Sequence, residues 1–172
     1  MISRIPMKPW LLLTLVLLSV GGGCIGIVSG AQIFTKVAGI TPTATVFGCI
    51  LIAFSAFTAA SGLLLAHEPR RTGPIRVALG LQVPYIYSPI FSYKMFCGVG
   101  VYAAAGLGFP EPFATIAESI GVRVEFGFGG HLELRWQYPW CFGVDLVAIF
   151  FLMALCRPGR KLAPDARQSL IS

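Results

Sequence analysis

Two long stretches without a charged residue constrain this chain more than any other feature of its sequence. Residues 9–35 and 37–66 contain no Asp, Glu, Lys or Arg, over 27 and 30 positions respectively. An α-helix rises 1.5 Å per residue, so about 20 apolar residues cross the ~30 Å hydrocarbon core of a bilayer. Both stretches are long enough to do so, and they predict transmembrane helices over residues 10–28 and 45–65.

The composition of the chain points to the same environment. Of its 172 residues, 56% are hydrophobic and 12% are charged, whereas a soluble domain carries about 25% charged residues. This excess of apolar residues indicates an integral membrane protein and excludes a disordered chain. The 13 basic residues outnumber the 7 acidic ones, but they form clusters at segment ends. We therefore expect no nucleic-acid partner.

Two further spans are predicted in the second half of the chain. Residues 77–101 are mostly apolar, although Pro84 and Pro89 interrupt them and would kink a membrane helix there. Residues 139–156 are apolar apart from Asp145. The expected fold is therefore an all-α membrane protein, a four-transmembrane-helix bundle that forms a single integral membrane domain over residues 1–172.

The basic residues give this arrangement an orientation. Nine of them fall on one side of the four spans: Arg4, Lys8, Arg70, Arg71, Arg76, Arg157, Arg160, Lys161 and Arg167. Basic loops are retained in the cytoplasm. We therefore expect a multi-pass protein of the cell inner (plasma) membrane, with both the N and C termini cytoplasmic.

The segment over residues 102–138 would then lie outside the cytoplasm. Glu111-Pro112 opens a predicted short helix that ends at Gly121, since Pro near the start and Gly after the end are typical of helix termini. Residues 122–136 alternate between apolar and charged around Gly129-Gly130, which indicates a β-hairpin.

The hairpin register can also be predicted. A three-residue turn places Phe126 opposite Leu134 and Glu125 opposite Arg135, an arrangement that pairs opposite charges. An isolated hairpin is marginally stable in water. Its apolar residues, with Phe126, Leu134 and Trp136 as the candidate partner surface, would therefore rest on the helices, the bilayer or another subunit.

Lys94 and Asp145 are the charged residues well inside the predicted spans. An unpaired charge there costs at least about 2.5–3.5 kcal/mol, which favours a pair or a wet cavity. One interpretation is a proton or ion pathway, with Gln82 and Tyr87 as candidate lining residues. The structural alternative is that Lys94 extends to the headgroups and Asp145 caps a helix or forms a pair.

Other chemistry has little support in the sequence. The five Cys residues form no C-x-x-C pair, and His67 and His131 fall in loops on opposite sides. No catalytic residue set, metal site or cofactor is expected. Cys24 follows three glycines, as at a lipoprotein processing site, but the apolar run continues past it and indicates a retained span. Gly22, Gly26 and Gly30 predict close helix packing, within the chain or in a homodimer.

These patterns favour a non-catalytic structural, assembly or accessory subunit that contacts a partner through its outer hairpin. The alternative is a small oligomeric transporter or channel that uses Lys94 and Asp145. A third hypothesis, an intramembrane enzyme, lacks a recognisable nucleophile and base. The expected partners are the lipid bilayer and either another protein or further copies of the chain.

Overall fold

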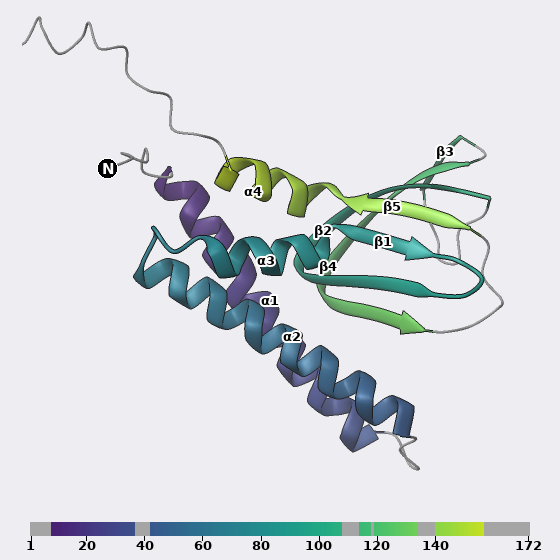
Figure 1. The fold of residues 1–172 in the computed structure, drawn as a ribbon, viewed down its shortest axis with the longest axis horizontal. Helices are drawn as coiled ribbons and strands as arrows, with labels where there is room; N and C mark the ends of the chain where they lie inside the picture. Colours follow the sequence, from purple (N-terminus) through teal and green to yellow (C-terminus); the bar gives the residue numbers. More distant parts are fainter. Residues whose placement is uncertain (1–7, 37–41, 108–113, 118, 134–139, 157–172) are drawn as a thin grey trace, which may run out of the picture.

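In the computed structural model, the described residues (8–36, 42–107, 114–117, 119–133 and 140–156) form four α-helices and five β-strands. In chain order these elements are α1 (Pro9–Lys36), α2 (Pro42–His67), α3 (Gly73–Gln82), β1 (Pro84–Tyr87), β2 (Ser92–Gly106), β3 (Ala114–Ala117), β4 (Ile120–Glu133), β5 (Cys141–Asp145) and α4 (Leu146–Cys156). The α1–α2 hairpin runs along one side of the molecule and the sheet lies beside it (Figure 1).

The two charge-free stretches form α1 and α2. Within them, Pro9–Gln32 and Thr45–His67 are long and apolar enough to cross a membrane. The glycines of α1 allow close packing within the chain, because Gly23 lies against Ser55 and Ala59 of α2 and Gly30 lies against Ile52. Without a Cβ atom, each lets the neighbouring helix approach closely.

The predicted four-helix membrane bundle is wrong, since the second half of the chain folds mainly as an antiparallel sheet. The expected third span, 77–101, divides into the short helix α3 and the strands β1 and β2. Helix α3 ends at Gln82, and Pro84, two residues later, begins strand β1. Proline has no backbone N–H group, so it cannot continue the hydrogen bonding of the helix. The alternating aromatic residues after Pro84 then favour strands.

The expected fourth span, 139–156, is also wrong. Residues Cys141–Asp145 form strand β5, and only Leu146–Cys156 are helical. A helix of 11 residues is about 16 Å long, roughly half the hydrocarbon thickness of a bilayer.

The predictions of an outer helix and of a hairpin are wrong as well. Residues Ala114–Ala117 are strand β3, and β4 continues through Gly129 and Gly130 without a turn. Strand β4 pairs with β2 over 14 positions, which include Phe126 with Val99. A long partner strand satisfies far more backbone groups than an isolated hairpin does. Residues 134–136 of the predicted hairpin lie outside the described residues.

The sheet has the strand order β1-β5-β2-β4-β3, with a further pairing between β1 and β2. Strand β2 pairs with β4 along one edge. On its other edge, the start of β2 pairs with β1 (Ser92 with Tyr87) and its end pairs with β5 (Ala104 with Gly143). Because β1 and β5 also pair with each other, these three strands close into a ring. Gly98, between the two pairings of β2, has a φ of 95°, a conformation that glycine adopts without steric cost.

Two apolar clusters join the hairpin to the rest of the molecule. The first lies among α1, α2, α3 and α4: Leu11, Leu15, Leu65, Ile75, Ala78, Leu79, Ala148, Phe151 and Leu155. Beside it, the Arg76 side chain donates a hydrogen bond to the Leu155 carbonyl, one of the carbonyls left free at a helix end. The second joins α2 to β2 and contains Leu51, Phe54, Met95 and Cys97.

Helix α1 contacts the sheet most closely at Gly22. A Cβ atom there would overlap the backbone of Gly98 and Cys97 in β2, whereas a Cβ at Gly21 would meet nothing within 4 Å. Gly22 therefore tests the contact between α1 and β2, and the adjacent Gly21 is a matched control in the same helix.

We expect Gly22→Ala to destabilise the protein by about 1–3 kcal/mol, because the added methyl forces α1 and β2 apart. Gly21→Ala should instead stabilise it by about 0.5–1 kcal/mol through a lower entropic cost of helix formation. Thermal unfolding in detergent micelles, followed by circular dichroism, measures both effects. Equal melting temperatures for the two variants would contradict the close contact.

Candidate functional site

Pairing in the sheet places the charged side chains of β2, β4 and β5 on one side, together with buried aromatic residues. Directly paired residues point to the same side of a sheet, so Glu125 shares a side with Gly100, and both Arg123 and Asp145 share one with Tyr102. We call this side the inner face. It comprises Tyr85, Tyr87, Lys94, Phe96, Tyr102, Ala104, Arg123, Glu125, Cys141 and Asp145.

Glu125 is the centre of a buried charged cluster on the inner face. Its Oε1 atom lies 2.6 Å from Nζ of Lys94 and 2.5 Å from Nε of Arg123. The side chains of Lys94, Glu125 and Arg123 are 6%, 9% and 24% exposed. Charged groups removed from water in this way need partners, and one carboxylate serves two cations here.

Aromatic rings surround the Lys94 ammonium group. Its Nζ atom lies 5.8, 5.7 and 5.4 Å from the ring centroids of Tyr85, Phe96 and Tyr102. The negative face of an aromatic ring attracts a cation within about 6 Å, and more strongly where water is excluded. The ring of strands β1, β5 and β2 therefore encloses a lysine held by a carboxylate and three aromatic rings.

Asp145 caps helix α4. Its Oδ1 atom accepts hydrogen bonds from the backbone N–H of Val147 (2.9 Å) and Ala148 (3.4 Å), the second and third residues of the helix. The same atom accepts a bond from Val101 of β2 at 3.2 Å. Asp145 is 1% exposed, so these backbone donors take the place of water around its carboxyl group.

Gln82 and Tyr87, the other candidate lining residues, are both buried. The Gln82 side chain accepts a hydrogen bond from the Cys97 N–H at 3.0 Å and donates one to the Ala78 carbonyl at 3.3 Å. The ring of Tyr87 lies 4.9 Å from that of Tyr85. Gln82 thus joins α3 to β2, and Tyr87 belongs to the aromatic cluster of the inner face.

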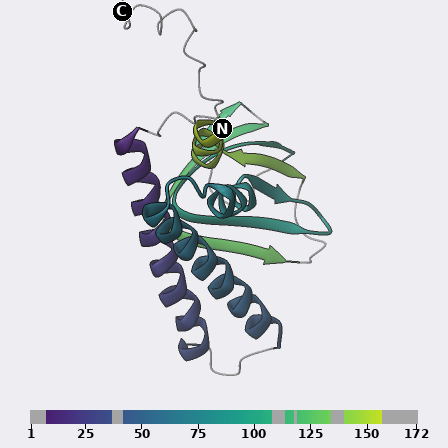
Figure 2. The same cartoon turned by 60° about the vertical axis from the view of Figure 1, so that its left-hand side comes forward.

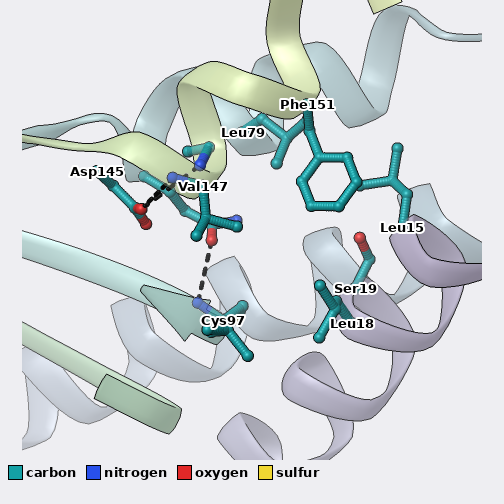
Figure 3. Close-up of a pocket in the computed structure, with 11 residues that line it drawn as sticks. Leu15, Leu18, Ser19, Leu79, Cys97, Asp145, Val147 and Phe151 are labelled. Carbon is teal, nitrogen blue, oxygen red and sulfur yellow. Dashed lines mark hydrogen bonds between the residues drawn. The ribbon is translucent and has the colours of Figure 1, made fainter. Parts of the chain in front are cut away.

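A small cavity lies between Asp145 and the helices (Figure 3). Its volume is about 10 Å³, which is room for roughly one water molecule. Ser19 of α1 and Asp145 are on its wall, among apolar side chains such as Leu15 and Phe151. A space of this size holds no organic substrate.

The structure therefore places Lys94 and Asp145 on two neighbouring strands of one sheet, not in two membrane helices. Lys94 forms an ion pair with Glu125, for which the sequence predicts a pair with Arg135 across a hairpin. The period-two alternation located Arg123 and Glu125 on one face of a strand. It could not say which face would be buried, because that depends on which strand pairs with β4.

The candidate partner surface is represented in the described residues by Phe126. Its side chain is 77% exposed and lies opposite to the inner face, on the side that also carries Val124, Phe142 and Val144. We call the exposed part of this side, formed by Val124, Phe126, Phe142 and Val144, the outer face. Leu134 and Trp136 lie outside the described residues.

Among the described residues, no group of three His, Cys, Asp or Glu side chains could hold a metal ion. All five cysteines are free thiols. Comparison with protein-family models, curated proteins and solved structures finds no match to this chain.

We expect Glu125→Leu to cost about 3–5 kcal/mol of stability, because it leaves Lys94 and Arg123 buried without their shared carboxylate. Replacement of all three by apolar residues (Lys94→Met, Arg123→Met and Glu125→Leu together) should recover most of this loss, since none of the three charges then stays buried. Thermal unfolding in detergent micelles measures both effects.

The ion pair between Arg71 and Glu68 provides the control, because these side chains are 64% and 44% exposed. We expect Arg71→Met to cost less than about 1 kcal/mol, as for other exposed pairs. If Glu125→Leu were as mild as Arg71→Met, the buried cluster would not hold the sheet together.

Proposed function

We propose that this chain is a multi-pass protein of the cell inner membrane, with a non-catalytic role as a structural or accessory subunit. The observation that carries the non-catalytic role is the way the buried charges are used. The Glu125 carboxylate binds two cations of its own chain, and the Asp145 carboxylate accepts three backbone hydrogen bonds. Groups engaged in this way hold the fold together.

The exposed side chains of the hairpin support a membrane location. Large apolar side chains are exposed along both helices: Leu13, Leu17, Ile25, Val28, Val46, Ile50, Phe57 and Leu63. Soluble monomers rarely expose apolar surface on this scale. Apolar side chains can face the lipid of a bilayer without cost, and helices of this length are long enough to cross it.

Charge at one end of the hairpin supports an orientation. Lys8 precedes α1, while Arg70, Arg71 and Arg76 follow α2. Both groups belong to the end at which α1 begins and α2 ends, and α4 returns to this end through the contact between Arg76 and Leu155. By the positive-inside rule, we assign this end, and with it both termini, to the cytoplasm.

A second candidate function is a small oligomeric transporter or channel. The observation in its favour is the buried Asp145 carboxyl beside a cavity large enough for a water molecule, since buried carboxyl groups of this kind relay protons in membrane carriers. The two functions differ in whether the negative charge of Asp145 is required.

The proposed orientation predicts which side of the membrane labels each end of α2. In a variant whose exposed Cys24, Cys49 and Cys156 are replaced by alanine, Arg70→Cys should react with a membrane-impermeant maleimide in inverted membrane vesicles only. Pro42→Cys should react in intact spheroplasts only. Reaction of both cysteines from the same side would show that the hairpin does not cross the membrane.

Asp145→Asn separates the structural role from transport, because an asparagine oxygen still caps a helix but carries no charge. We expect Asp145→Asn to keep the melting temperature of the wild type, and Asp145→Leu to lose about 1–2 kcal/mol. Wild-type and Asp145→Asn proteins are each reconstituted into liposomes that contain a pH-sensitive dye. Both kinds of proteoliposome should hold an imposed pH gradient for as long as protein-free liposomes do. Discharge by the wild type alone would favour the transporter.

A further inference from the structure

The charged side chains of β2 and β4 lie on the opposite side of the sheet from that expected in a water-soluble protein. The charged side chains Lys94, Arg123 and Glu125 lie on the inner face, while Val124 and Phe126 are exposed on the outer face. In a sheet exposed to water on one side, the polar residues occupy that side. Charges turned inward and apolar residues turned outward are instead typical of strands surrounded by lipid.

Contacts with the hairpin give the depth of the sheet. Gly22, which touches Gly98 and Cys97 of β2, lies near the middle of α1 (Pro9–Lys36). At 1.5 Å per residue it is about 20 Å from either end of the helix. Phe54, near the middle of α2, belongs to the cluster that contains Met95 and Cys97. If the hairpin crosses a bilayer, β2 contacts the hairpin near the bilayer midplane.

The two short helices have the length needed to reach this depth. Helix α3 begins six residues after α2 ends and runs for 10 residues to Gln82, whose side chain binds the backbone of Cys97. Helix α4 begins at the Asp145 cap, which is bonded to β2, and runs back for 11 residues. Each is about 15–16 Å long, or half of the hydrocarbon core.

We propose that the outer face of the sheet lies inside the membrane, in contact with lipid acyl chains. The proposal rests on the proposed membrane location of the hairpin and adds that the sheet is embedded beside it. Helices α3 and α4 then occupy the cytoplasmic half of the bilayer, and the sheet occupies the other half. Figure 2 shows the sheet beside the hairpin, with the turn end of the hairpin extending past it.

The spread of exposed apolar side chains over several elements indicates that lipid covers the outer face. Exposed apolar side chains continue from the hairpin to Val77 and Leu81 of α3, Phe150 and Met153 of α4, and the outer face. A protein partner covers one bounded patch, whereas lipid surrounds a molecule on all sides. Among the described residues, the edge of β4 after Val122 pairs with no strand. Unpaired backbone groups are costly in hydrocarbon, so at this edge alone a protein contact is favoured over lipid.

The proposal is tested by the fluorescence of single tryptophans in full-length protein, reconstituted into phosphatidylcholine vesicles. Trp10, Trp136 and Trp140 are replaced by phenylalanine, and one tryptophan is introduced at a time. Phe126→Trp reports on the outer face and Ile25→Trp on the exposed side of α1. Arg70→Trp, beyond the end of α2, is the aqueous control. Each protein is compared in vesicles with and without bromine on the acyl chains, and with aqueous iodide.

We expect brominated chains to quench Phe126→Trp to the same degree as Ile25→Trp, and iodide to quench Arg70→Trp alone. Phe142→Trp, also on the outer face, provides a second reading if Phe126→Trp does not fold. Quenching of Ile25→Trp by bromine together with quenching of Phe126→Trp by iodide would place the sheet in water. That result would overturn this inference and leave the membrane hairpin intact.

Two further outcomes would also overturn it. If neither quencher reaches Phe126→Trp while bromine quenches Ile25→Trp, a protein partner or a second copy covers the outer face. If bromine fails to quench Ile25→Trp, the hairpin does not cross the bilayer, and the proposed function fails with the inference.

Discussion

The contact between Gly22 of α1 and Gly98 of β2 is the constraint on which the rest of the structure depends. Two backbones meet there without side chains between them, so the sheet is tied to the middle of the hairpin. This position requires α3 and α4 to be short, because each connects the middle of the hairpin to one end. The short lengths of these helices thus match the position at which the sheet meets the hairpin.

The same position explains why the charges lie inside the sheet. The strands close into a ring against the hairpin, and the ring encloses Lys94 among aromatic side chains with Glu125 as its counter-ion. Desolvated charges are tolerated only where partners are fixed around them. The cluster therefore specifies one strand pairing, since a shift of β4 by one residue would turn Glu125 to the outer face.

The sequence predicted parts of this arrangement for sound physical reasons. The absence of charge located both long helices, and the alternation from Val122 onward indicated extended structure with its charges on one face. The structural alternative for Asp145, a helix cap, is the geometry observed. Predictions failed where an apolar run was interpreted as a helix. Hydrophobicity alone does not distinguish a buried strand from a membrane helix. Pro84 and Pro89 predicted kinks in a helix, but Pro84 begins β1 and Pro89 lies between β1 and β2.

The sequence by itself determined the two long apolar helices, the basic residues near the ends of the hairpin and the alternation along β4, because these depend only on composition and local periodicity. Only the tertiary structure decided that β4 pairs with β2, that Glu125 binds both Lys94 and Arg123, and that the inner face is the charged one. The pair of Lys94 with Glu125 joins residues 31 positions apart. No local pattern specifies which distant strand satisfies a given backbone edge or which distant charge meets which partner.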